Sequence, residues 1–237
     1  MTLTRAVHYA DGATHLEGVL ARPESADRPL PGLLLIHGGA GLDDHARAQA
    51  ARYAELGYAV LAADMFGPGI AGNRERVVAT LTELRDNPGL AVRRASAGMS
   101  ALAACPEASG CVAAVGFCFG GMVVLALARA GVDIAGVISM HGSLRTSAPA
   151  GEGAVRSRVL VCHGSADPHV PFADVTSFVD EMGAAGADWQ VLILGGAVHG
   201  FTHRDAVAGA MPGVAYDEAA DRRSFEAARL LLAELAT

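Results

Sequence analysis

Basic residues are scarce in this sequence. Of its 237 residues, 18 are Lys or Arg and 25 are Asp or Glu, which gives a net charge of −7 with histidine counted as neutral. Affinity for nucleic acid comes mainly from Lys and Arg that neutralise phosphates, so this balance argues against a nucleic-acid partner. Charges of one sign do not gather into a block either, and we expect no charged interaction tail.

Long hydrophobic runs are also missing. No stretch approaches the roughly 18 uninterrupted apolar residues of a membrane span, and the first eight residues contain no apolar signal core. Only four cysteines are present, without a C-x-x-C pair, so a disulfide scaffold is excluded and reduced thiols are expected. We therefore expect a soluble, cytoplasmic protein with no membrane partner.

No repeat, low-complexity segment or linker divides the chain, so residues 1–237 are predicted to form a single domain, as a monomer or homodimer. Apolar residues make up 51% of the sequence, enough for a sizeable core.

Short apolar runs alternate with helical patterns. Residues 33–36, Leu-Leu-Leu-Ile, are typical of a central strand covered on both faces. Further strands are expected over 58–63, 111–115, 134–140, 158–163 and 189–194, and helices over 43–57, most of 73–105 with a break near 87–89, 119–130, 172–182 and 225–235. Residues 4–9 and 14–22 predict an opening antiparallel hairpin. The pattern predicts an α/β fold, with a mostly parallel sheet of about eight strands and helices on both faces.

Residues 116–121 read Gly-Phe-Cys-Phe-Gly-Gly and lie between a predicted strand and a predicted helix. This spacing matches the nucleophile elbow G-x-S-x-G, with Cys118 in the place of serine. The glycines are needed because the turn is so sharp that positions two residues either side of the nucleophile have no room for a side chain. At the helix N-terminus, the dipole favours the reactive thiolate. The motif alone would also fit a buried structural cysteine at a tight turn.

Two later loops carry an acid and a base. Asp167 follows the predicted strand 158–163, and His199 lies in a glycine-rich loop after 189–194. Alone, Asp167 would fit a turn former and His199 a solvent-facing loop residue. However, loops at the carboxyl ends of parallel strands meet at one sheet edge, and the order nucleophile, acid, histidine is that of α/β-hydrolases. Together the loops predict a catalytic triad of Cys118, His199 and Asp167.

A fourth loop, residues 37–41 with the sequence His-Gly-Gly-Ala-Gly, follows the strand 33–36. It resembles the H-G-G oxyanion loop of esterases. The backbone N–H groups of Gly39 and Phe119 are expected to face the oxygen that becomes negative, with Gly38 as an alternative donor.

The chain resembles the dienelactone hydrolase family over nearly its whole length. The most specific segments are 116–121, 164–171 and 197–201. The resemblance implies an α/β-hydrolase fold, no metal or organic cofactor, and hydrolysis of a small-molecule ester or lactone by the Cys118, His199 and Asp167 triad.

Two positions depart from the best-known members of that family. Those members have a glutamate at the position of Gly38, where it holds the resting thiol, and an arginine at the position of His203, where it binds a substrate carboxylate. Without a carboxylate at position 38, Cys118 is predicted to be permanently activated. Gly38 and His203 remain candidate substrate-binding residues, together with His141, which follows the strand 134–140.

These residues predict attack of the Cys118 sulfur on an ester or lactone carbonyl, through a thioester intermediate. An amidotransferase-like thiol enzyme and a peroxide-reactive thiol protein are the alternatives. The position of Asp167 on its own strand end argues against the first, and the intact set of three residues against the second. His199 and His203 have no third ligand at supporting spacing, so no metal is expected.

Overall fold

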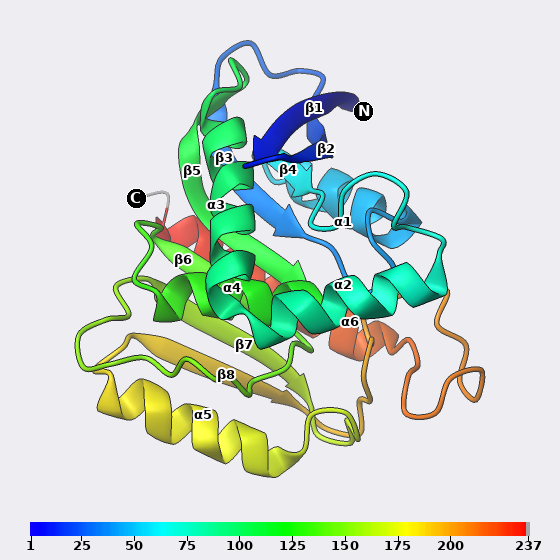
Figure 1. The fold of residues 1–237 in the computed structure, drawn as a ribbon, viewed down its shortest axis with the longest axis vertical. Helices are drawn as coiled ribbons and strands as arrows, with labels where there is room; N and C mark the ends of the chain where they lie inside the picture. Colours follow the sequence, from blue (N-terminus) through cyan, green and yellow to red (C-terminus); the bar gives the residue numbers. More distant parts are fainter. Residues whose placement is uncertain (236–237) are drawn as a thin grey trace.

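One eight-stranded sheet runs through the protein (Figure 1). The computed structural model describes residues 1–235. The strands are β1 (Thr2–Asp11), β2 (Thr14–Pro23), β3 (Leu30–Ile36), β4 (Ala59–Ala63), β5 (Ala108–Phe117), β6 (Gly136–Met140), β7 (Arg158–Gly164) and β8 (Trp189–Leu194). Their order in the sheet is β1-β2-β4-β3-β5-β6-β7-β8, with β2 antiparallel to both of its neighbours and the other pairs parallel. The predicted α/β fold and opening hairpin are confirmed.

Helices cover both faces of the sheet, and each face has its own hydrophobic core. The helices are α1 (Asp44–Ala54), α2 (Arg74–Asp86), α3 (Pro88–Ala103), α4 (Phe119–Arg129), α5 (Phe172–Ala184) and α6 (Glu218–Leu235). Helices α1 and α6 pack into one core, and α3, α4 and α5 into the other. Successive residues of β3 point to opposite faces: Leu33 and Leu35 enter the α1/α6 core, and Leu34 and Ile36 enter the other. This alternation explains why the strand is apolar throughout.

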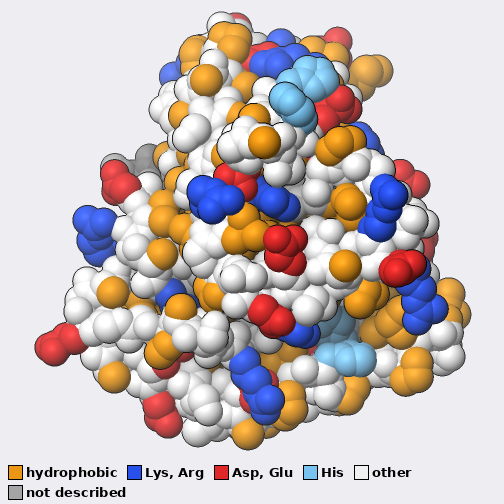
Figure 2. All heavy atoms as spheres, in the orientation of Figure 1, with side chains coloured by type: hydrophobic (Ala, Val, Ile, Leu, Met, Phe, Trp, Pro, Cys, Tyr) orange, Lys and Arg blue, Asp and Glu red, His pale blue; other side chains and the backbone are white. Residues whose placement is uncertain are grey.

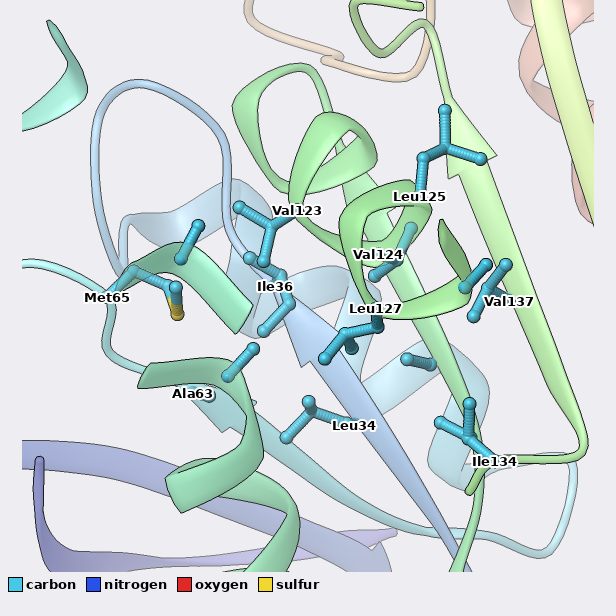
Figure 3. Packing of buried hydrophobic residues seen from close by; sticks show 14 of the residues in the cluster. Leu34, Ile36, Ala63, Met65, Val123, Val124, Leu125, Leu127, Ile134 and Val137 are labelled. Carbon is cyan, nitrogen blue, oxygen red and sulfur yellow. The ribbon is translucent and has the colours of Figure 1, made fainter. Parts of the chain in front are cut away.

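Helix α4 is fixed by apolar contact with the central strands. Its side chains Val123 and Leu127 lie beside Ile36 and Leu34 of β3 (Figure 3), and each is fully buried. Burying a side chain of this size contributes about 1.5–3 kcal/mol. Because α4 begins at residue 119, this packing also fixes the turn that precedes the helix.

The predicted element limits differ from the observed ones by a few residues. The expected break near 87–89 is present, because α2 ends at Asp86 and Pro88 occupies the first turn of α3. Strand β5 extends beyond the predicted 111–115, since its pairing with β3 continues to Ala108 through a register shift. Strand β6 begins at Gly136, two residues later than expected, because its pairing with β5 begins there. Within residues 1–235, no helix combines the length and apolar character needed to cross a bilayer.

Candidate active site

Cys118 sits on the turn between β5 and α4, with a backbone φ of 53°. Residues other than glycine rarely adopt a positive φ, so this backbone conformation needs support from the surrounding structure. Glycines provide the space: a Cβ at Gly116 would overlap the carbonyl of Gly120, and a Cβ at Gly120 would overlap the carbonyl of Ile36. The turn therefore holds the sulfur at the N-terminus of α4, as the glycine spacing predicts.

The structure brings the three predicted residues into contact in series. The Nε2 atom of His199 lies 3.0 Å from the Sγ atom of Cys118, and its Nδ1 atom lies 2.8 Å from Oδ2 of Asp167. The other carboxylate oxygen of Asp167 accepts hydrogen bonds from the backbone N–H groups of His169 and Val170 at 2.8 and 3.2 Å. The carboxylate is thus held on both sides, and one of its oxygens is left to orient the imidazole.

These contacts shift the protonation of all three groups. Burial on its own lowers the pKa of His199, but its hydrogen bonds to Asp167 and Cys118 outweigh burial and raise this pKa to about 10. Burial raises the pKa of the Cys118 thiol, but the hydrogen bond from His199 and the positive charge of that ring outweigh burial and lower it below its usual range. Burial also raises the pKa of Asp167, and the hydrogen bond to His199 reverses this. These shifts all favour a thiolate at Cys118 beside an imidazolium at His199 over a neutral pair.

Two backbone amides face the sulfur. The N–H groups of Phe119 and Gly39 both favour the thiolate by hydrogen bonding. Phe119 opens α4, whereas Gly39 belongs to the loop after β3. These are the two amides expected to form an oxyanion hole, and Gly38 precedes Gly39 in the same loop.

The orientation of Gly39 depends on His37, whose role the sequence did not indicate. The Nε2 atom of His37 accepts a hydrogen bond from the Met65 backbone N–H at 3.1 Å, so the ring proton is on Nδ1. That proton is donated to the carbonyl of Gly38 at 2.7 Å. In a trans peptide, the C=O of one residue and the N–H of the next point in opposite directions. His37 therefore turns the N–H of Gly39 towards Cys118.

His37 can do this because it stays neutral. The ring is fully buried, and burial lowers its pKa below the usual value. A protonated ring would lose the acceptor that bonds Met65.

The candidate binding residues Gly38, His141 and His203 line one cavity with Cys118 and His199. His141 is buried with a φ of 41°, and its ring stands edge-on to that of His199, with centroids 5.2 Å apart. Burial, followed by the charge of His199, keeps the pKa of His141 well below its usual value. It is thus a neutral ring beside the imidazole of His199.

Two further residues were not predicted, namely His45, which lines this cavity, and the buried Thr202 behind it. The hydroxyl of Thr202 lies 2.8 Å from Nε2 of His141 and 3.2 Å from Nε2 of His45. The ring of His45 in turn stacks on that of His203 at a centroid distance of 4.7 Å. No sequence signal pairs residues 45 and 202, because they meet only when α1 and the loop after β8 pack together.

No three His, Cys, Asp or Glu side chains within residues 1–235 converge as metal ligands. The four cysteines are free, and Cys105 and Cys162 are buried away from the site. Burial raises the pKa of Cys111 and Cys162 to about 12, whereas the pKa of Cys118 is lowered.

The sequence and the fold are similar to those of known proteins. A sequence profile of the dienelactone hydrolase family matches residues 16–235. The structure is similar to that of the dienelactone hydrolase-like promiscuous phosphotriesterase P91 from metagenomic libraries, with 39% identity, 99% of this chain and 98% of that chain covered, and a TM-score of 0.91. It also shares its fold with a dienelactone hydrolase from Anabaena variabilis, at 21% identity, coverage of 99% and 96%, and a TM-score of 0.66. An uncharacterised protein from Caenorhabditis elegans is 36% identical over 160 residues, which span 63% of this chain and 96% of that protein.

Proposed function

Because the chain belongs to the dienelactone hydrolase family, and is therefore a hydrolase of esters or lactones, we propose that it cleaves its substrate with Cys118 as nucleophile, His199 as acid and base, and Asp167 as the group that orients His199. The observation that carries this proposal is the continuous contact from Sγ to Nε2 at 3.0 Å and from Nδ1 to the carboxylate at 2.8 Å. Such a series of contacts is the geometry that activates a nucleophile.

In the first half-reaction, the thiolate of Cys118 attacks the carbonyl carbon, and the carbonyl oxygen becomes negative. The N–H groups of Gly39 and Phe119 stabilise this oxyanion. When the intermediate collapses, the C–O bond breaks, and the imidazolium of His199 gives its Nε2 proton to the departing oxygen. The alcohol or enol leaves, and the acyl group remains on sulfur as a thioester.

In the second half-reaction, water attacks the thioester while neutral His199 accepts a proton from it. The C–S bond breaks, and the acid is released. Cys118 departs as a thiolate and His199 keeps the proton, so the resting ion pair is restored. Because a thiolate is itself a good leaving group, the first intermediate reverts unless the alcohol also leaves easily. Activated esters and enol lactones suit this chemistry.

The decisive experiment is the hydrolysis of p-nitrophenyl acetate by the wild-type protein and by Cys118→Ala and Cys118→Ser. We expect the alanine variant to lose more than about 10³-fold in kcat, consistent with loss of a nucleophile. Mass spectrometry of quenched wild-type protein should show one acetyl group, on the peptide that contains Cys118. An unchanged rate in Cys118→Ala would end the proposal. Cys111→Ala is the matched control, since its thiol is not activated.

A second candidate activity is the hydrolysis of neutral phosphotriesters. It is favoured by the protein named a promiscuous phosphotriesterase, which matches this chain at 39% identity over nearly its full length. The same thiolate would attack phosphorus and expel an aryloxide, and water would then cleave the S–P bond. Release of p-nitrophenol from diethyl p-nitrophenyl phosphate, and its loss in Cys118→Ala, tests this activity.

We also propose that residues 1–237 form one domain and act in the cytoplasm on small molecules, as a monomer or homodimer. Reduced thiols suit that compartment, and the four cysteines of this chain are free. Light scattering of the purified protein measures its oligomeric state.

A further inference from the structure

Two cavities meet at the nucleophile. One has a volume of about 470 Å³ and the other about 460 Å³. Both are lined by the residues at the junction, which are Gly39, Cys118, His199, Met211 and Val214. We name the two cavities the α2 arm, which runs along helix α2, and the loop arm, which runs beneath residues 203–214. The sulfur lies where the arms join, so a molecule bound at Cys118 can extend in two directions.

The α2 arm is lined mainly by apolar side chains. These are Val78, Leu81, Phe119, Met122, Val170, Met211 and Val214. Its lining includes one arginine, Arg85, whose Nε atom lies 2.9 Å from Oδ1 of Asp86. The ion pair with Asp86 partly offsets the charge of this exposed arginine.

The loop arm is apolar at its surface and carries acidic charge. Small or apolar residues line most of it, including Ala40, Phe117, Ala206, Val207 and Ala210. Asp43 and Asp205 also line it, whereas none of its lining residues within 1–235 is Lys or Arg. His199 also lines this arm, but its positive charge is already paired with Cys118 and Asp167. A negatively charged group placed here would therefore lose hydration and meet two further carboxylates. In Figure 2, histidine side chains lie in a hollow below α2 with hydrophobic side chains beside them.

The geometry of an ester relates these arms to the substrate. The carbonyl carbon of an ester carries three substituents in one plane: the carbonyl oxygen, the chain of the acyl part and the oxygen of the alcohol part. When the carbonyl oxygen is held by Gly39 and Phe119, the acyl and alcohol groups must leave the junction in different directions. The α2 arm and the loop arm are the two cavities that open from this point.

We propose that the natural substrate is an uncharged ester with an apolar group on each side of its carbonyl, one in the α2 arm and the other in the loop arm. This inference rests on the proposed function, because it takes Cys118 as the attacking group. It adds the substrate class: a neutral ester with two apolar ends, in place of an acid with a free carboxylate.

The experiment blocks one arm at a time with tryptophan. Val78 lines the α2 arm and is 55% exposed, and Val207 lines the loop arm and is 68% exposed. Both side chains are at the surface, so Val78→Trp and Val207→Trp should fold. Leu230→Trp is the matched control, because Leu230 is 56% exposed on α6 and lines neither arm.

Each protein is assayed with two series of neutral esters, one varying the acyl chain from acetyl to hexanoyl and one varying the alcohol from phenyl to naphthyl. We expect each arm variant to lower the large-to-small ratio of kcat/KM by about tenfold in one series only, and the two variants to act on opposite series. The loss of one CH₂ contact changes the ratio of kcat/KM between two substrates by about 10-fold or more, so the effect of blocking an arm is large enough to measure. Both variants acting on the same series, or neither acting on any, would overturn the proposal.

Charge is tested with a pair of esters of matched size, one ending in a carboxylate and the other in the corresponding methyl amide. The wild-type protein should hydrolyse the amide-terminated ester at least about tenfold faster at low ionic strength, and salt should reduce the difference. Faster hydrolysis of the carboxylate ester would overturn the proposal, and loss of that preference in Arg85→Gln would show that the α2 arm binds anions. Failure of the proposed function would look different, since Cys118→Ala would then hydrolyse p-nitrophenyl acetate as fast as wild type.

Discussion

The charges on Cys118 and His199 depend on each other, so the two groups should titrate as a pair. Both are half-buried, and burial taken alone favours the neutral form of each. The hydrogen bond between them and the carboxylate of Asp167 together hold the proton on nitrogen. Activation of the thiol is thus a property of three residues and not of the cysteine alone.

The pH profile follows from these shifts. The thiolate forms as pH rises through the lowered pKa of Cys118, and the imidazolium loses its proton as pH passes about 10. We expect kcat/KM for esters to rise with pH below the usual range of a free thiol, remain flat, and fall near pH 10. Absorbance of the thiolate at 240 nm measures the first transition.

In Asp167→Asn, the carboxylate that supports the imidazolium is replaced by a neutral amide. The pKa of His199 should fall, the pKa of Cys118 should rise, and kcat/KM should drop by about 10²–10⁴-fold at neutral pH. An unchanged thiol titration in this variant would contradict the ion-pair description. Asp188→Asn, at an exposed acid distant from the site, serves as the control.

His37 offers a test of how the oxyanion hole is positioned. His37→Phe keeps a ring of similar size but removes the side-chain donor to the Gly38 carbonyl, which the Gly41 N–H also bonds at 3.2 Å, and the acceptor for the Met65 N–H. We expect kcat per titrated active-site thiol to fall by about a hundredfold with little change in KM, as for loss of one oxyanion donor. A role in folding alone would lower the amount of active protein and leave kcat per thiol intact. The exposed His8→Phe is the control.

At the scale of elements, the position of α4 depends on close approach of its first turn to β3. A Cβ at Gly120 would overlap the backbone carbonyl of Ile36, which cannot move without displacing a central strand. Gly120→Ala should therefore lower the free energy of unfolding in urea by about 1–3 kcal/mol or more and also reduce activity. Gly89→Ala, in the first turn of α3, meets no atom within 4 Å and should be neutral or slightly stabilising.

The strands and helices could be predicted from the sequence because each element buries a periodic apolar face. The run at 33–36 and the glycine spacing around Cys118 predicted both a central strand and the turn that carries the sulfur. The order of Cys118, Asp167 and His199 then predicted their convergence, because parallel strands end at one edge. That convergence is seen in the structure, whereas the catalytic roles await the experiments above.

The residues that line the two arms could not be predicted from the sequence in this way. His45 comes from α1, Val207 from the loop after β8, and Val78 from α2, so no local period relates them. Residues 203–214 contain no regular helix or strand, and their apolar side chains follow no pattern that predicts a pocket. Such contacts depend on how separate elements pack, which one sequence does not encode by spacing.

At the scale of the whole molecule, Cys118 and His199 follow strands that differ in their distance from the edge of the sheet. Cys118 follows β5, which is paired on both sides, whereas His199 follows β8, the last strand in the order. Within residues 1–235, strand β8 pairs only with β7. Beyond it, the N–H of His199 donates to the carbonyl of Gly213, and the N–H of Ala215 donates to the carbonyl of His199.

An edge strand of this kind should open more often than the middle of the sheet. On gentle warming, turnover should therefore decay before circular dichroism reports loss of secondary structure. Hydrogen–deuterium exchange would then find deuterium entering residues 189–199 first, while the amides of β5 stay protected. Thermal inactivation of the enzyme is therefore expected to begin at the edge strand of its sheet. Stronger pairing between β7 and β8 should lengthen the half-life of activity without any change at the sulfur.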